Sequence, residues 1–132
     1  MREIRYRGIG IAERKWVFGS LWFDTRDGVT LIWSEELKYW VRVDPATVGQ
    51  YTGLKDEHGK EIYEGDVIRS PLSEDKTRPH RIFYHTGNAA FMGALVDRKE
   101  LCYLRLDQDW IYKFGKEVIG NIHDNPELLK NE

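Results

Sequence analysis

The hydrophobic residues in the first third of the chain alternate with polar residues or form short aromatic runs, and both patterns are typical of β-strands. The candidate strands cover residues 2–7, 15–23, 29–33 and 39–43. Asp27 and Gly28 supply a hairpin-turn signal between the second and third of these runs. The pattern therefore predicts an antiparallel meander over residues 2–43.

Short strand-like runs continue through the rest of the chain, separated by turn residues. These candidate strands cover residues 61–68, 80–86, 89–96, 101–106, 110–114 and 117–122. Gly65 and Asp66 predict a tight turn inside the first of them. Residues 70–79 are polar and contain two prolines, so we expect an exposed loop there.

The last residues predict a short helical turn. Asn125 is a good N-cap, Pro126 suits the first helical position, and Glu127 suits the positive end of a helix. Together with the strand pattern, this predicts a mainly β fold with a short C-terminal helical turn.

Composition places the chain among globular proteins, because 41% of its residues are hydrophobic and 13% are aromatic. The net charge is −2, and residues 1–52 carry 8 basic and 7 acidic side chains, so neither part is strongly basic. No run of about 18 apolar residues and no signal-peptide pattern is present. The single cysteine, Cys102, cannot form an internal disulfide, and we expect a reducing, cytoplasmic location and a buried, packing role for its side chain.

No catalytic or metal-binding spacing is present in the sequence. The four histidines, His58, His80, His85 and His123, are scattered and lack zinc-site spacing. The glycines at 53 and 59 do not fit a phosphate-binding loop, because five residues separate them and no serine or threonine follows Lys60. We therefore expect no metal and no organic cofactor. The acidic cluster at residues 61–66 is better explained by turn-forming and solvated side chains than by a catalytic pair.

One segment combines basic and aromatic side chains, as nucleic-acid-binding surfaces do. The candidates for nucleic-acid contact are Arg69, Lys76, Arg78, Arg81 and Tyr84. Glu74 and Asp75 lie in the same segment and weaken its positive charge. The competing interpretation is a solvated loop beside an ordinary strand.

Four blocks of the sequence are distinctive: residues 2–8 (REIRYRG), 16–21 (WVFGSL), 43–68 (VDPATVGQYTGLKDEHGKEIYEGDVI) and 117–129 (EVIGNIHDNPELL). These blocks resemble the YopX family of bacteriophage and prophage proteins. They occur in the family's order and span nearly the whole chain, and residues 70–116 match least. The resemblance implies an N-terminal β segment over residues 1–52, a small SH3-like β-barrel over residues 53–132, and a tendency to self-associate. It implies no activity.

The residues carried over from the resemblance are structural ones, which form turns, caps or core contacts. They are Gly49, Tyr51, Gly53, Asp56, Gly59, Tyr63, Gly65, Asp66, Gly120 and Asn125, with Trp16 as a further core or core-edge aromatic.

We expect a non-enzymatic phage accessory protein that acts as a protein-interaction or self-assembly module. The alternatives are a small nucleic-acid-binding barrel and, third, an enzyme of unknown type. Self-association is expected because the N-terminal meander has more large apolar surface than it can bury alone. The side chains that supply this surface are Trp16, Phe18, Trp22, Trp33 and Trp40.

Overall fold

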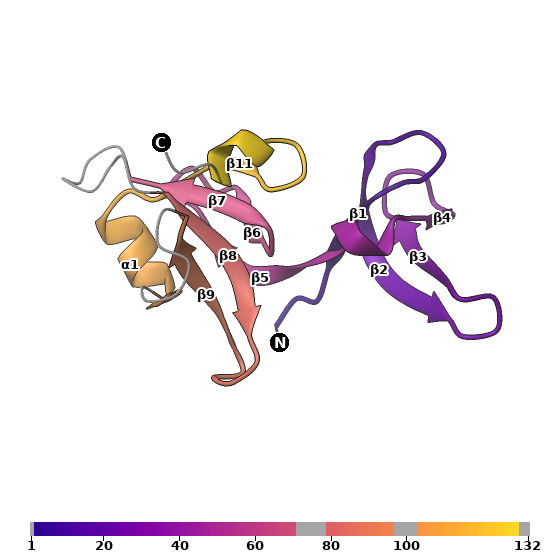
Figure 1. The fold of residues 1–132 in the computed structure, drawn as a ribbon, viewed down its shortest axis with the longest axis horizontal. Coiled ribbons are helices and arrows are strands. Elements are labelled where there is room, and N and C mark those ends of the chain that lie inside the picture. The colour runs from indigo at the N-terminus through magenta and orange to yellow at the C-terminus, as the bar shows by residue number, and fades with distance from the viewer. Residues whose placement is uncertain (1, 71–78, 97–102, 130–132) are drawn as a thin grey trace. The chain divides into compact units, whose positions relative to one another are not determined.

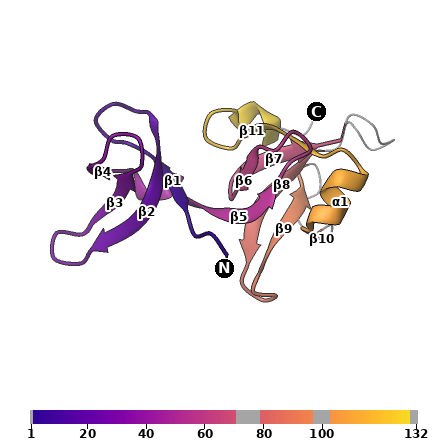
Figure 2. The ribbon, with the colours of Figure 1, turned by 180° about the vertical axis from the view of Figure 1, so that it is seen from behind.

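The computed structural model describes residues 2–70, 79–96 and 103–129, and within them the chain is mostly β (Figures 1 and 2). The N-terminal elements are β1 (Tyr6–Ile9), β2 (Trp16–Asp24), β3 (Val29–Ser34), β4 (Trp40–Arg42), a 3-10 turn η1 (Pro45–Thr47) and β5 (Gly49–Lys55). The later ones are β6 (Glu61–Tyr63), β7 (Asp66–Arg69), β8 (His80–His85), β9 (Ala90–Leu95), β10 (Tyr103–Arg105), α1 (Gln108–Lys113), β11 (Glu117–Asn121) and a 3-10 turn η2 (Pro126–Leu129). All strand pairs in the two sheets are antiparallel, which confirms the predicted fold class, and η2 is the predicted C-terminal helical turn.

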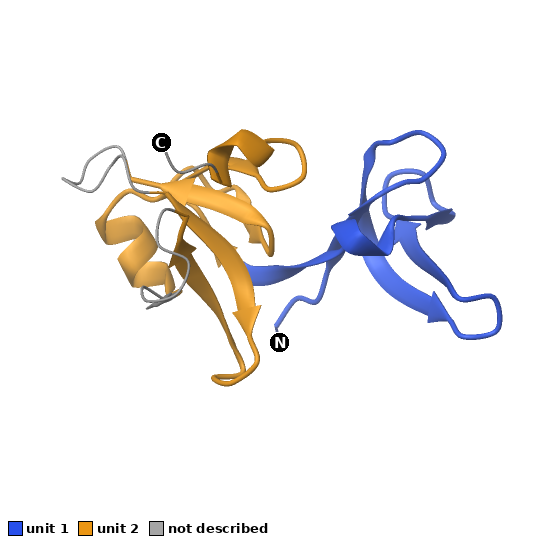
Figure 3. Ribbon diagram, viewed as in Figure 1, with its two compact units in different colours: residues 1–53 blue, residues 54–132 orange. Residues whose placement is uncertain are grey.

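The chain divides into two compact units, residues 1–53 and residues 54–132 (Figure 3). Strand β5 contains this boundary. Its first residues pair with β1 in the first unit, and its last two residues lead into the second unit.

The N-terminal unit is the predicted meander, and its chain returns to close on the first strand. Strands β1 to β4 pair in sequence order. After β4, Val43 forms a bridge with Gly10, and the Ile11 amide donates to the Arg42 carbonyl at 3.0 Å. This bridge and this hydrogen bond join the end of β4 to the end of β1. The inner faces of the four strands therefore enclose one small core.

That core consists of three buried side chains, Val17, Ile32 and Val43. Partly buried residues complete it, namely Tyr6, Val41 and Val48. Gly8 lies against this cluster, and a Cβ there would meet Ile32 and Val43 atoms at 3.2 Å. The inner space is therefore already filled by small and branched side chains, with no room for the larger aromatic residues of the same strands.

The C-terminal unit contains a five-stranded antiparallel sheet in the order β10-β9-β8-β7-β11. Its core joins buried residues from the sheet, from β6, from α1 and from the segment before the helix: Ile62, Ile68, Ile82, Leu106 and Ile111. Closure of this sheet into an SH3-like barrel remains an implication of the resemblance.

Residues 110–113 lie in α1 and Phe114 is its C-cap, so the prediction of a strand over residues 110–114 was wrong. The Asp107 side chain accepts a hydrogen bond from the Trp110 amide at 2.8 Å and caps the helix N-terminus. Ile111 is buried, whereas Tyr112 is exposed. The aromatic residues favoured a strand by propensity, but the aspartate cap and the burial of Ile111 determine the helix.

One buried carboxylate joins the turn after β5 to the last strand of the C-terminal unit. Asp56 Oδ1 accepts hydrogen bonds from the amides of His58 and Lys60 at 2.8 and 2.9 Å. Its Oδ2 accepts one from the Val118 amide in β11 at 3.0 Å. The Glu57 amide adds a hydrogen bond to the Lys116 carbonyl at 2.9 Å, so the turn is held on β11 by backbone groups on both sides.

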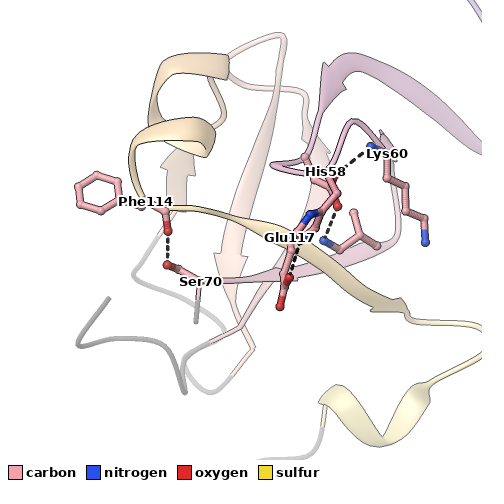
Figure 4. A network of polar contacts seen from close by, with 7 residues as sticks. His58, Lys60, Ser70, Phe114 and Glu117 are labelled. Atoms are coloured by element: carbon pink, nitrogen blue, oxygen red, sulfur yellow. Dashed lines mark hydrogen bonds and ion pairs between the residues drawn. The ribbon is translucent and has the colours of Figure 1, made fainter. Parts of the chain in front are cut away.

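A second buried hydrogen bond connects distant segments of the same unit, near the start of β11. The Ser70 hydroxyl donates to the Phe114 carbonyl (Figure 4), which connects the end of β7 to the residues just after α1. Ser70 is fully buried. The polar contacts of this unit therefore bridge segments that lie more than forty residues apart in sequence.

Asp56→Ala should destabilise the protein by about 3 kcal/mol, because three backbone amides lose their acceptor in a buried setting. Asp56→Asn should cost less, because one side-chain oxygen remains to accept. Urea unfolding measures both variants, with Glu57→Ala as the exposed neighbouring control. Equal stability of Asp56→Ala and the control would contradict a stabilising role for the hydrogen bonds that Asp56 accepts.

Gly65→Val should cost about 1–3 kcal/mol, because Gly65 has a φ of +92°, in the left-handed region that a β-branched side chain disfavours. Its amide donates to the Ile82 carbonyl and its carbonyl accepts from the Ile122 amide, so the backbone cannot relax freely. Thermal melts measure the cost. Gly28→Asn is the control, since Gly28 has a φ of +67°, which asparagine tolerates, and open space around it. If Gly65→Val melted at as high a temperature as the control, the predicted backbone strain at position 65 would be contradicted.

Candidate functional site

The outer face of the N-terminal unit gathers large aromatic side chains from three neighbouring strands. In the strand register Trp33 lies opposite Ser20 on one side and Trp40 on the other, and Trp22 lies opposite Leu31. Directly opposed residues share a face of a sheet, and alternation adds Phe18 to the same face of β2. We call this face the aromatic surface. It consists of Phe18, Ser20, Trp22, Leu31, Trp33, Trp40 and Arg42.

Each of the four rings of the aromatic surface is exposed over more than a third of its surface. Phe18, Trp22, Trp33 and Trp40 are 40%, 47%, 36% and 40% exposed. The Trp40 ring contacts the other two indoles, with centroid distances of 5.5 Å to Trp22 and 5.6 Å to Trp33. The ring planes are inclined by 60° and 73°, the edge-to-face arrangement that aromatic pairs favour. The indoles therefore support one another although no core covers them.

Trp16 differs from the four exposed aromatics. It is only partly exposed, and the Arg7 guanidinium lies 4.6 Å from the centre of its ring. Arg7 itself is buried. By alternation Trp16 lies on the same face of β2 as Phe18, where Arg7 partly covers it, and the other four of the five aromatics expected to supply surplus apolar surface are exposed.

Of the five candidates for nucleic-acid contact, the structure describes Arg69, Arg81 and Tyr84. Lys76 and Arg78 lie outside the described residues. Arg81 and Tyr84 are three residues apart in β8 and therefore point to opposite faces of the sheet. Arg81 stacks over the Phe83 ring at 5.3 Å, and Tyr84 packs edge-to-face with Phe91. Arg69 lies on β7 opposite Glu117, which places a carboxylate next to this basic residue.

A family model matches residues 5–130, and its description is YopX protein. The chain belongs to the YopX family. The crystal structure of protein EF1440 from Enterococcus faecalis is similar to this YopX family member, with a TM-score of 0.64 and 26% sequence identity. The similarity covers 98% of this chain and 100% of the other. No curated protein sequence is significantly similar to this chain. Neither match names an activity, a ligand or a partner.

The residues that carry the YopX resemblance occupy turns and tight contacts. Asp66 is buried and its carboxylate accepts the Tyr63 amide at 2.8 Å. A Cβ on Gly120 would lie 2.5 Å from Asn125 Oδ1, and that oxygen accepts the Asn121 amide. The others lie at the start of β5 (Gly49), within it (Tyr51, Gly53), and in the turns that follow (Asp56, Gly59, Gly65). Most of these motif residues thus shape turns or accept hydrogen bonds from backbone amides.

The described part of the chain contains no group of three or more histidine, cysteine, aspartate and glutamate residues placed to hold a metal ion. His80 is buried and its ring contacts Trp110 at 6.0 Å. Cys102 lies outside the described residues. Within the same described ranges, no helix is long and apolar enough to cross a membrane.

His58 and Glu117 form an ion pair between the Asp56 turn and β11, at 3.0 Å from Nε2 to Oε2 (Figure 4). The hydrogen bond to Glu117 raises the pKa of His58, and the charges of Asp56 and Glu57 act in the same direction. The ring is exposed, so water and salt screen the pair. The pair therefore supplements the Asp56 hydrogen bonds rather than replacing them.

Glu117→Gln should lower the pKa of His58 toward its ordinary value of about 6.5. Because the pKa of the folded protein is raised, the stabilisation from this pair is fully present below about pH 6.5 and is lost as the pH rises through the folded value. An NMR titration of the His58 ring gives the pKa. Urea midpoints at about pH 5.5 and pH 8.5 should show the difference between wild type and Glu117→Gln only at the lower pH. Glu36→Gln, in the other unit, is the control, and an unchanged His58 pKa in Glu117→Gln would contradict the pairing.

Proposed function

We propose that this YopX family member is a non-enzymatic protein-interaction module that binds partners, further copies of itself included, through the aromatic surface. We also propose that it is a phage or prophage accessory protein and acts in the bacterial cytoplasm. The observation that carries the proposal is the exposure of four aromatic rings together on one face of the N-terminal unit.

Residue type supports a binding role for this face. Tryptophan, other aromatics and arginine are enriched at the centres of protein interfaces and dominate their binding energy. Here three tryptophans, a phenylalanine and Arg42 lie on neighbouring strands of one sheet. Scattered apolar residues are normal on a protein surface, but a contiguous group of this kind marks an interaction site.

The non-enzymatic part of the proposal rests on the sequence, which contains no recognisable catalytic motif or spacing. The nucleic-acid alternative has less support than the protein-interaction function. Its described candidate residues are divided between the two faces of β8, and Arg69 lies opposite an acidic residue.

Self-association through the aromatic surface predicts a concentration-dependent mass. Light scattering coupled to size exclusion should give more than the 15.6 kDa of one chain at high micromolar concentration. Trp22→Ala combined with Trp40→Ala should return the protein to one chain, because the rings at the centre of the contact are removed. Tyr112→Ala is the matched control, since Tyr112 is 54% exposed on α1 in the other unit.

A wild-type mass of one chain at every concentration would overturn the self-association. An oligomer that persists in the folded double variant would show that another surface forms it. Circular dichroism melts of the variants establish that they remain folded.

A further inference from the structure

The exposed area of the aromatic surface limits what binds there. An aromatic side chain presents roughly 150–250 Å², so the exposed fractions of the four rings leave about 250–400 Å². A stable interface between globular proteins needs about 800 Å² from each partner. The rings alone supply less than that, so a contact with a globular partner, a further copy of the chain included, needs the surrounding residues as well, whereas the rings by themselves suffice for a short, extended segment.

The hydrogen-bonding groups of the aromatic surface are mostly donors. Arg42 and the indole N–H groups only donate, and the Ser20 hydroxyl is the single group that also accepts. No carboxylate or carboxamide side chain belongs to the surface. A ligand that fits these groups is rich in hydrogen-bond acceptors and has few donors that need an acceptor on the protein.

This inventory argues against sugars and nucleic acids. Sugar hydroxyls need acceptors as well as donors, and only Ser20 offers one. A nucleic acid needs a positive groove, whereas Arg42 is the one exposed cation among these residues and Arg7, opposite Phe18, is buried. At the Phe18 end, the Glu35 amide donates to the Phe18 carbonyl at 3.1 Å, and the Glu35 side chain is paired with Arg5. The charges beside the rings are thus balanced.

We propose that the aromatic surface binds a proline-rich peptide segment in the polyproline II conformation. This proposal rests on the proposed function and names the class of partner. Such a segment has no internal hydrogen bonds, its carbonyls are free to accept, and each proline lacks an N–H that would need an acceptor. Aromatic surfaces bind it through apolar contact with the pyrrolidine rings, and the segment is already ordered before binding.

The spacing of the rings also suits this ligand. A polyproline II helix repeats every three residues, or about 9 Å along its axis. Trp40 lies between Trp22 and Trp33 in the chain of ring contacts, at 5.5 and 5.6 Å. The outer two rings are therefore separated by no more than the sum of these distances, so two turns of the ligand are long enough to contact all three rings. The inclined rings do not provide the single flat platform on which a base or a sugar ring stacks.

A ten-residue polyproline peptide tests the proposal in an NMR titration that follows the tryptophan indole N–H signals. The indoles of Trp22, Trp33 and Trp40 should shift in a saturable manner, whereas Trp110, on α1 in the other unit, should not. Trp40→Ala should weaken binding at least tenfold, which is the effect expected of a central interface aromatic. Trp40→Phe keeps an aromatic ring and should weaken peptide binding less than Trp40→Ala. This result would show that the loss in Trp40→Ala comes from the missing ring and not from misfolding. Phe23→Ala is the matched control, because Phe23 is 56% exposed on the opposite face of β2 and should change affinity less than twofold.

Three comparison probes are titrated in the same way: a glycine-serine peptide of equal length, a linear hexamer of β-1,4-linked glucose, and a ten-nucleotide thymidine strand. Saturable polyproline binding that depends on Trp40, and is tighter than binding of every other probe, supports the proposal. Absence of saturation at millimolar peptide, equal binding by Trp40→Ala, or tighter binding of the sugar or the thymidine strand would overturn it. Mass measurements on the same samples keep the two proposals separate. Self-association lost in the tryptophan variants without any peptide binding would overturn this inference and leave the interaction module standing.

Discussion

A small β unit can bury only one face of its strands, and this constraint determines the surface of the N-terminal unit. The bridge between Gly10 and Val43 brings the end of β4 back to β1, so the inner faces close around Val17, Ile32 and Val43. The inner space is so small that a Cβ on Gly8 would lie 3.2 Å from side-chain atoms of Ile32 and Val43, closer than ordinary contact. Strand alternation then places every second residue on the outside, where Trp22, Trp33 and Trp40 cannot be covered by the same chain segment.

The C-terminal unit combines its apolar core with polar side chains that accept hydrogen bonds from backbone amides. Asp56 joins its own turn to β11, Asp66 fixes the turn before β7, and Asn125 holds the residues after β11. A buried carboxylate is tolerated where each oxygen accepts from backbone amides. This explains why the sequence blocks that carry the YopX resemblance are rich in glycine, aspartate and asparagine although no catalytic arrangement is recognisable among them.

These two modes of construction separate the structural residues from the residues available for binding. The motif residues form turns and bind backbone amides, so substitutions there change the stability of the fold. The aromatic surface contributes little to the core of its own unit, so substitutions there test binding with a smaller effect on folding. The donor-rich, nearly neutral chemistry of this surface distinguishes it from both the basic candidates on β7 and β8 and the acidic residues of the turns.

The sequence by itself determined the local structure wherever one signal dominated. Alternation and the Asp27–Gly28 turn predicted the meander, and Asn125 with Pro126 predicted the final helical turn, because hairpin turns and caps depend on residues close together in sequence. It did not determine α1, where the strand propensity of Trp110, Tyr112 and Phe114 competed with an aspartate cap and the burial of Ile111 decided the outcome. Only the tertiary structure showed which strands lie side by side, and therefore that Trp22, Trp33 and Trp40 from three strands share one exposed face. Strand register and the choice of buried face depend on contacts between segments far apart in the chain, and a single sequence does not specify which segments meet.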